Sequence, residues 1–201
     1  GKRGNWEIER FKITDEELFD YDLDIVKKPY AVRMRKPEPG VYTRLLLHDS
    51  VFPTTVMSDV YGELASLERF VSIATGSILI NGLGLGVALN AVLLKPDVRH
   101  VTVVEWSEDV IHLVGTQYEK RLSDGIYGEK QLDIIQEDSM GYKPARGQKF
   151  NVVWHDIWNN LSPESIPEID KLKKMYARRL VLPGKRQGAW MEMEIKIANR
   201  M

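Results

Sequence analysis

The chain of 201 residues is long enough for one α/β domain, or for one domain with an extension. Its 28 Lys and Arg residues nearly balance its 29 Asp and Glu residues, so the composition does not indicate nucleic acid or an anionic membrane as a partner. Because the chain has no cysteine, disulfides, thiolate metal sites and a cysteine nucleophile are excluded.

Signals for membrane insertion or export are not found in the sequence. No apolar run reaches the length of a membrane span, and the first residues lack the apolar core of a signal peptide. We therefore expect a cytoplasmic protein without a membrane anchor, and we expect no metal site.

The first 58 residues are expected to form an extension ahead of a main domain over residues 59–201. Residues 1–40 mix aromatic and charged side chains with poor periodicity, which predicts a loosely structured arm or a small cap. Residues 41–57 are rich in strand-forming residues and are interrupted by turn residues. This pattern predicts a β-hairpin before the main sheet.

The main domain is predicted to begin with a helix, a strand and a second helix. Apolar residues recur at helical spacing over residues 60–74, after Ser58 and Asp59 as N-cap candidates. Residues 78–80 form a short apolar run typical of a buried strand, and residues 87–94 form an apolar helix behind it.

Three more strands are predicted downstream, and acidic residues lie at the end of each. They cover residues 100–105, 132–138 and 150–154. Ser107 is expected to cap the helix that follows the first of these strands. The sequence His155-Asp156 follows the last of them.

The C-terminal part is predicted to hold one helix and one edge strand. Ser165 and Glu168 fit a capping box for a helix over residues 166–180. Residues 189–197 alternate between apolar and polar side chains, which predicts an edge strand with one solvent-exposed face.

Strands and helices therefore alternate along the main domain. This pattern predicts an α/β fold of the Rossmann-like, doubly wound kind. We expect a mostly parallel sheet with helices on both faces, and an N-terminal β-hairpin as its extension.

A glycine-rich turn joins the first predicted strand of this sheet to its helix. Glycines in such a turn let the backbone approach a ligand closely, and the helix amides then face that ligand. A dinucleotide-binding turn has the pattern G-x-G-x-x-G/A. Counting from Gly82 places Val87 at its last position, and counting from Gly84 places Leu89 there. Neither fits, whereas G-x-G-x-G ending at Gly86 does fit the sequence.

This glycine pattern is followed by an acid at the end of the second strand, Glu105, and another at the end of the third, Asp138. In that order the motifs resemble those of class I S-adenosylmethionine-dependent methyltransferases, over residues 77–197. The resemblance implies that the glycines lie against the methionine and ribose of S-adenosylmethionine, and that Glu105 accepts hydrogen bonds from the ribose hydroxyls. It further implies that Asp138 binds the adenine amine, that the Ser139 amide lies near the ring, and that Trp106 covers an adenine face.

The same resemblance implies a site for the methyl acceptor next to the cofactor. Asp156 would face the methyl donor, and Asp156 and His155 are the candidates for a general base. Further candidates for contact with the acceptor are Asp59, Tyr61, Glu63 and Trp158. The acceptor itself is not identified by the sequence, which shows no basic, aromatic-interleaved groove for nucleic acid. A homo-oligomer is a further expectation.

Within this superfamily the chain looks like the spermidine-synthase-like branch, which includes methyltransferase-like proteins of phages and prophages. The resemblance rests on Met57-Ser58-Asp59, on Glu63 and on the sequence GLGLG. Aminopropyltransferases carry an Asp inside the glycine turn, where this chain has Leu85. They also carry an Asp-rich loop after the fourth strand, where this chain has residues 155–160. These departures disfavour polyamine synthesis.

Three functions remain open from the sequence. The first is transfer of a methyl group from S-adenosylmethionine. The second is aminopropyl transfer, and the third is a non-catalytic cofactor-binding or assembly role. Full class I domains continue to a sixth and a seventh strand, whereas this chain stops shortly after Ile197. We therefore expect a shortened C-terminal edge of the sheet, which favours the third function.

Each site residue also has a plainer interpretation. The glycines could serve only close packing of strand and helix. Glu105 could be an exposed acid, Glu137 could replace Asp138, and Asp156 could cap a helix or hold a loop. The remaining candidates could be ordinary structural or surface residues: His155, Asp59, Glu63 and Trp158.

Overall fold

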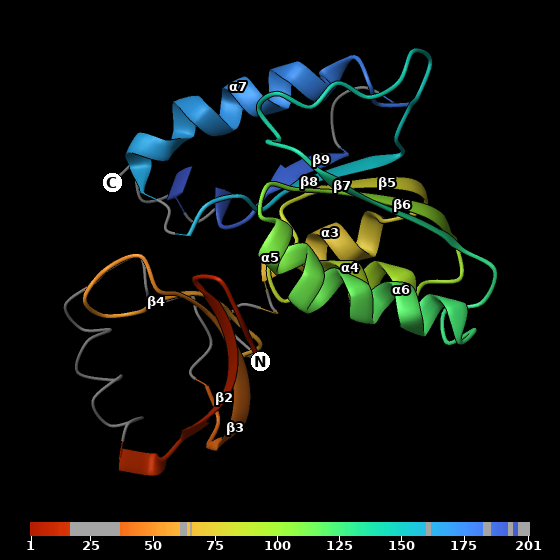
Figure 1. Cartoon of the computed structure of the whole chain (residues 1–201). Coiled ribbons are helices and arrows are strands. Elements are labelled where there is room, and N and C mark those ends of the chain that lie inside the picture. Colours follow the sequence, from red (N-terminus) through yellow and green to blue (C-terminus); the bar gives the residue numbers. More distant parts are fainter. Residues whose placement is uncertain are drawn as a thin grey trace.

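The computed structural model describes residues 1–16, 37–60, 64, 66–159, 162–182, 186–192 and 195–196. Within these residues the chain forms a four-stranded antiparallel sheet and a five-stranded parallel sheet (Figure 1). The antiparallel sheet has the order β1-β2-β3-β4 and consists of β1 (Lys2–Arg3), β2 (Trp6–Ile13), β3 (Gly40–Leu47) and β4 (Thr54–Ser58).

The antiparallel sheet confirms the predicted hairpin and corrects the prediction for the residues before it. Strands β3 and β4 are the two arms of the hairpin. Strand β2 pairs with β3 over its whole length, from Trp6 opposite Leu47 to Ile13 opposite Gly40. The prediction of a loose arm was therefore wrong for β2. Its charged residues gain partners on β3, as Glu9 does with Arg44, and this cross-strand pairing is not visible in the sequence.

The parallel sheet has the strand order β7-β6-β5-β8-β9, and every pair in it is parallel. The chain builds outward from β5 through β6 to β7, and then returns to the other side of β5. This confirms the doubly wound α/β fold, because the order reverses beside the first strand. The strands are β5 (Gly76–Asn81), β6 (Val98–Glu105), β7 (Gln131–Gln136), β8 (Val152–His155) and β9 (Gln187–Ala189).

Helices cover both faces of the parallel sheet (Figure 1). Helix α7 (Ile166–Ala177) lies on one face, after a short 3₁₀ turn, η3 (Pro163–Ser165). The other face carries α3 (Glu68–Ile73), α4 (Val87–Leu93), α5 (Glu108–Val110), the π-helical segment η2 (Ile111–Gly115) and α6 (Thr116–Ser123). Among the described residues, no helix has both the length and the apolar character that crossing a membrane requires.

Two predictions for helix starts have different outcomes. The side chain of Ser107 accepts a hydrogen bond from the Val110 amide at 3.3 Å, so the predicted N-cap is confirmed. The capping box is wrong, because Ser165 makes no such bond at the start of α7. Its hydroxyl instead accepts from the Ser162 amide, and Glu168 accepts from the indole of Trp158.

The predicted last strand, residues 189–197, is also wrong. Strand β9 ends at Ala189, where the predicted strand begins, and Met191 has a φ of 48°. The Ile195 amide then bonds to the Met191 carbonyl in the manner of a helix. Glu192 accepts from Lys196 one turn later and from Lys173 of α7. These ion pairs favour a helical turn over the alternating strand.

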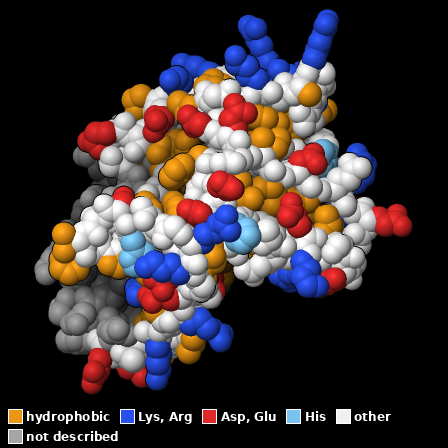
Figure 2. All heavy atoms as spheres, viewed as in Figure 1, with side chains coloured by type: hydrophobic (Ala, Val, Ile, Leu, Met, Phe, Trp, Pro, Cys, Tyr) orange, Lys and Arg blue, Asp and Glu red, His pale blue; other side chains and the backbone are white. Residues whose placement is uncertain are grey.

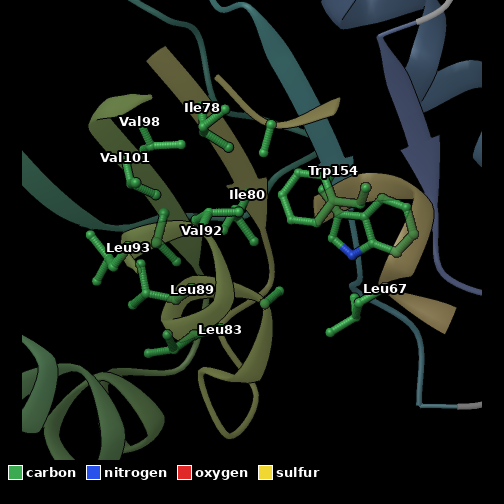
Figure 3. Packing of buried hydrophobic residues seen from close by; sticks show 14 of the residues in the cluster. Leu67, Ile78, Ile80, Leu83, Leu89, Val92, Leu93, Val98, Val101 and Trp154 are labelled. Carbon is green, nitrogen blue, oxygen red and sulfur yellow. The ribbon is translucent and has the colours of Figure 1, made fainter. Parts of the chain in front are cut away.

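One apolar cluster connects the two sheets. It contains β5 and β6 residues, the inner faces of α3 and α4, and Trp6 and Leu45 from the antiparallel sheet. Figure 3 shows its centre, where Ile78 and Ile80 of β5 lie beside Val92 and Leu89 of α4. A second cluster lies between the sheet and α7. The antiparallel sheet is therefore packed against the main domain through buried side chains.

Basic side chains gather at one end of the molecule. Figure 2 shows Lys and Arg side chains projecting over α7 and over the loop between β7 and β8. Lys149 of this loop donates to the Arg178 carbonyl, and Arg179 donates to the Ala145 carbonyl. Because β8 begins and α7 ends here, this surface lies at the amino ends of the parallel strands.

Candidate functional site

A pocket lies at the carboxyl ends of the parallel strands, where open α/β sheets bind their ligands. Loops after β5, β6, β7, β8 and β9 contribute to it, and the antiparallel sheet closes one side. Its lining residues are Trp6, Leu45, Val56, Met57, Gly82, Gly84, Val104, Glu105, Trp106, Val110, Asp138, Ser139, Asp156, Ile157, Trp158, Asn159 and Trp190.

Glu105 at the end of β6 is the most buried acid of this pocket, with 5% of its surface exposed. One carboxylate oxygen accepts from the Leu83 amide at 2.8 Å, and the other accepts from the Ser107 amide at 2.9 Å. Burial raises the pKa of Glu105, and the hydrogen bonds from Ser107, Leu83 and Trp106 oppose this shift. A carboxylate has about four acceptor sites, so these amides do not use all of them.

The three glycines of the turn after β5 have φ values between 51° and 93°. A Cβ at Gly82 would lie 1.9 Å from the Asp156 carbonyl oxygen. At Gly84 it would lie 2.5 Å from the Met57 sulfur, and at Gly86 2.2 Å from the Tyr118 ring. All three positions have a left-handed backbone that favours glycine, and at Gly82 an added Cβ would also meet fixed backbone of the protein itself. Gly82 and Gly84 also line the pocket, whereas Gly86 does not.

Asp138 and Ser139 follow β7 and line the pocket on the other side of β6 from the strand that carries the glycine turn. Asp138 is exposed, and one of its carboxylate oxygens accepts from the Met140 amide at 2.9 Å. The same residue's carbonyl accepts from the Gly141 and Tyr142 amides, which closes a tight turn. Ser139 is buried, and its carbonyl accepts from the Tyr176 hydroxyl at 2.7 Å.

The structure separates the two candidates for a general base. Asp156 is half-buried and lines the pocket, and its amide bonds to the Asn81 carbonyl at 2.8 Å. His155 does not line the pocket and is completely buried. Asn81 and Gln187 each hydrogen-bond one of its ring nitrogens. Burial lowers the pKa of His155 to about 4, so the ring is neutral near pH 7.

The antiparallel sheet supplies a wall that the sequence did not predict. Trp6 of β2 meets Trp106 edge to face, with ring centroids 6.1 Å apart. The Met57 sulfur of β4 accepts from the Leu85 amide at 3.3 Å, above the glycine turn. Leu45 and Val56 complete this wall. In the sequence these residues are recognisable only as apolar. Apolar character alone does not show that residues far apart in the chain, such as Trp6 and Trp106, are in contact.

The remaining candidates for contact with the acceptor have different positions. Trp158 lines the pocket and donates its indole N–H to Glu168. Asp59 is not among the lining residues, and its carboxylate accepts from the Thr43 amide at 2.7 Å, where β4 leaves β3. Tyr61 and Glu63 lie outside the described residues.

The pocket is acidic and aromatic. Its described lining contains three carboxylates, those of Glu105, Asp138 and Asp156, and no Lys, Arg or His. Four of the chain's five tryptophans line it. The described part of the chain contains no group of three or more His, Asp or Glu residues that could hold a metal ion. Such a lining favours a ligand with positive charge and flat or apolar parts.

Comparisons with known proteins give partial matches. No family model matches the chain. It is 28% identical over 156 residues to a polyamine aminopropyltransferase from Ruegeria sp. (strain TM1040), a match that covers 76% of this chain and 54% of that protein. The chain therefore spans about half the length of this curated relative.

Solved structures with different activities resemble parts of the chain. The CcbJ methyltransferase from Streptomyces caelestis matches with 19% identity and a TM-score of 0.42, over 61% of this chain and 45% of that chain. An S-adenosylmethionine-dependent methyltransferase from Clostridium acetobutylicum ATCC 824 matches with 16% identity and a TM-score of 0.39, over 58% and 46%. The [4+2]-cyclase SpnF matches with 20% identity and a TM-score of 0.42, over 62% and 42%.

Proposed function

We propose that this pocket binds S-adenosylmethionine and that the protein transfers its methyl group to an acceptor held beside Asp156. The observation that carries the proposal is the Glu105 carboxylate. It is buried at the pocket wall, it is oriented by hydrogen bonds from backbone amides, and it retains acceptor capacity for hydroxyls of a ligand. A ribose presents such a pair of hydroxyls.

The other lining residues fit the remaining parts of this nucleoside. Asp138 and Ser139 lie after the neighbouring strand and would receive the adenine edge. Trp106 is 63% exposed, although its neighbours in sequence are buried, and its ring is available to cover the adenine face. Gly82 would allow the backbone after β5 to lie close to the sugar.

The chain's residues would contribute mainly by positioning. The bound sulfonium supplies a methyl group that is already activated for displacement. Asp156 follows β8, the strand next to β5, and would orient the acceptor beside this methyl group. Such positioning would account for most of the rate acceleration. Where the acceptor carries a proton, the Asp156 carboxylate would accept it. Trp158 and Trp190 would exclude water from the same end of the pocket.

Aminopropyl transfer is the second candidate, and two observations favour it. The curated relative in sequence is described as an aminopropyltransferase. In addition, no described lining residue is a cation that could pair with the carboxylate of a methionine group. A decarboxylated sulfonium nucleoside lacks this carboxylate and carries one more net positive charge. It would therefore suit a lining of three carboxylates.

Calorimetry with S-adenosylmethionine, S-adenosylhomocysteine and the decarboxylated nucleoside tests the proposal. We expect Glu105→Ala to weaken binding by about 100-fold or more, because it removes two charge-assisted hydrogen bonds of about 1.5–3 kcal/mol each. Glu108→Ala is the matched control, because Glu108 is exposed and does not line the pocket. Equal binding by both variants would contradict the proposal.

The same titrations separate the two candidate reactions. Preference for S-adenosylmethionine by tenfold or more supports methyl transfer, and preference for the decarboxylated nucleoside supports aminopropyl transfer. Turnover is then measured with radiolabelled donor and a panel of amine and hydroxyl acceptors. Binding that depends on Glu105 without any turnover would contradict both reactions. It would support the third function, a non-catalytic cofactor-binding role.

A further inference from the structure

A chain of buried polar side chains lies between the parallel sheet and α7. Asn81 at the end of β5 donates to Nδ1 of His155 at the end of β8, at 2.8 Å. Nε2 of His155 bonds to the Gln187 side-chain oxygen at 3.0 Å, and Gln187 donates to the Lys173 carbonyl at 2.9 Å. The His155 ring also packs against the Tyr176 ring, with ring centroids 5.6 Å apart, and the Tyr176 hydroxyl donates to the Ser139 carbonyl at 2.7 Å.

We propose that Asn81, His155 and Tyr176 form a positioning network that fixes three pocket loops relative to one another. The proposal rests on the proposed function, because it concerns how that pocket holds its nucleoside. None of the three residues lines the pocket. They are positioning residues, and they act through their neighbours in the chain.

Each member of the network is joined to a pocket residue. Asn81 directly precedes Gly82, and its carbonyl accepts from the Asp156 amide. His155 directly precedes Asp156. Through the Ser139 carbonyl, Tyr176 reaches the turn that begins at Asp138. The ends of β5, β7 and β8 are thus linked by side chains that are at most 1% exposed.

The surroundings of the network explain why it would fix one arrangement. Leu79, Val153 and Leu172 pack around it in the cluster beneath α7. In an apolar surrounding, a displaced loop would leave a polar group without its partner, at a cost of about 1–3 kcal/mol. Apolar side chains alone would tolerate small shifts of the loops, because their contacts have no direction.

Tyr176→Phe tests the proposal, since it removes only the hydroxyl that holds the Ser139 carbonyl. Tyr142→Phe is the matched control. Tyr142 lies in the same cluster, and its hydroxyl forms no hydrogen bond within the described residues. We expect Tyr176→Phe to weaken S-adenosylhomocysteine binding about tenfold, the effect of one net hydrogen bond. Tyr142→Phe should change it by less than about twofold.

A second measurement uses the protein without ligand. Hydrogen exchange followed by mass spectrometry should show faster exchange at residues 139–142 in Tyr176→Phe and parent-like exchange in Tyr142→Phe. Unchanged affinity in Tyr176→Phe, or an equal loss in both variants, would overturn the proposal. If the parent protein does not bind the nucleoside, the proposed function fails. The exchange data then decide separately whether Tyr176 positions the loop.

Discussion

At the scale of single residues, His155 and Asp156 are neighbours in the chain with different surroundings. His155 packs against the Tyr176 ring beneath α7, whereas Asp156 lines the pocket. Successive residues at the end of a strand point to opposite faces of the sheet, which explains the difference. Of these two neighbours only Asp156 lines the pocket, and it is therefore the one that we propose as a proton acceptor.

The buried histidine gives a prediction for stability against pH. The pKa of His155 is about 4 in the folded protein, below its ordinary value of 6.5. Between these values the unfolded chain binds a proton that the folded chain does not. Stability is therefore lost as the pH falls below 6.5, by about 2 kcal/mol at pH 5 from this residue.

Urea unfolding of the parent and of His155→Gln at pH 7 and pH 5 measures this loss. The variant should lose about 2 kcal/mol less than the parent between the two pH values. Burial raises the pKa of Glu105, so Glu105 has an effect of opposite sign, but it is common to both proteins and cancels. His112→Gln is the control, because His112 is exposed. The account of His155 is wrong if both variants show the parent's pH dependence.

At the scale of elements, the turn between β5 and α4 is determined by its neighbours as much as by its own sequence. Gly82 packs against the backbone after β8, and Met57 of β4 covers Gly84. The turn is thereby held between the loop after β8 and the antiparallel sheet. Its conformation depends on both contacts.

Substitution of Gly82 by alanine separates close packing from backbone strain. An alanine at a positive φ costs about 1–2 kcal/mol wherever it occurs. Gly125 has a φ of 77° and nothing within 4 Å of the added Cβ, so Gly125→Ala measures this strain alone. Gly82→Ala adds a clash with the Asp156 carbonyl, and we expect a further loss of about 2–3 kcal/mol in the free energy of unfolding. Equal losses would show that the contact is not tight.

Strands β5 to β8 and the hairpin of β3 and β4 were predictable from the sequence, whereas β2 and the segment after β9 were not. Strands β5, β6 and β8 are buried apolar runs that end at glycines or acids, and this local pattern is sufficient to locate them. The alternation over residues 189–197 was misleading. Its charged residue Glu192 pairs with Lys173 of α7, and such tertiary partners cannot be inferred from a local pattern.

At the scale of the whole molecule, the two sheets share one core and one pocket. Trp6 and Leu45 are buried in the same cluster as the main sheet, and Arg3 forms a 3.0 Å ion pair with Asp109 of α5. The acids at the strand ends could be predicted to meet, because parallel strands end at one edge. The wall that carries Trp6 could not be predicted, because one hundred positions separate it from its partner Trp106.

A shared core predicts one cooperative unfolding transition. Leu45 of β3 is 1% exposed, so Leu45→Ala should lower the free energy of unfolding by about 2–5 kcal/mol. Val41→Ala on the same strand is the control, because Val41 is 59% exposed and should change stability by about 0.5 kcal/mol or less. Far-ultraviolet circular dichroism and tryptophan fluorescence should report the same midpoint in each protein. An early transition that is separate from the main one would contradict a shared core.

The most direct test of the account is a crystal structure of the protein grown with S-adenosylhomocysteine. The account predicts the nucleoside at the carboxyl ends of β5 and β6, with both ribose hydroxyls donating to Glu105 and the adenine beside Asp138. A pocket filled by Met57 and the tryptophans, or a ligand that leaves Glu105 without contact, would contradict it.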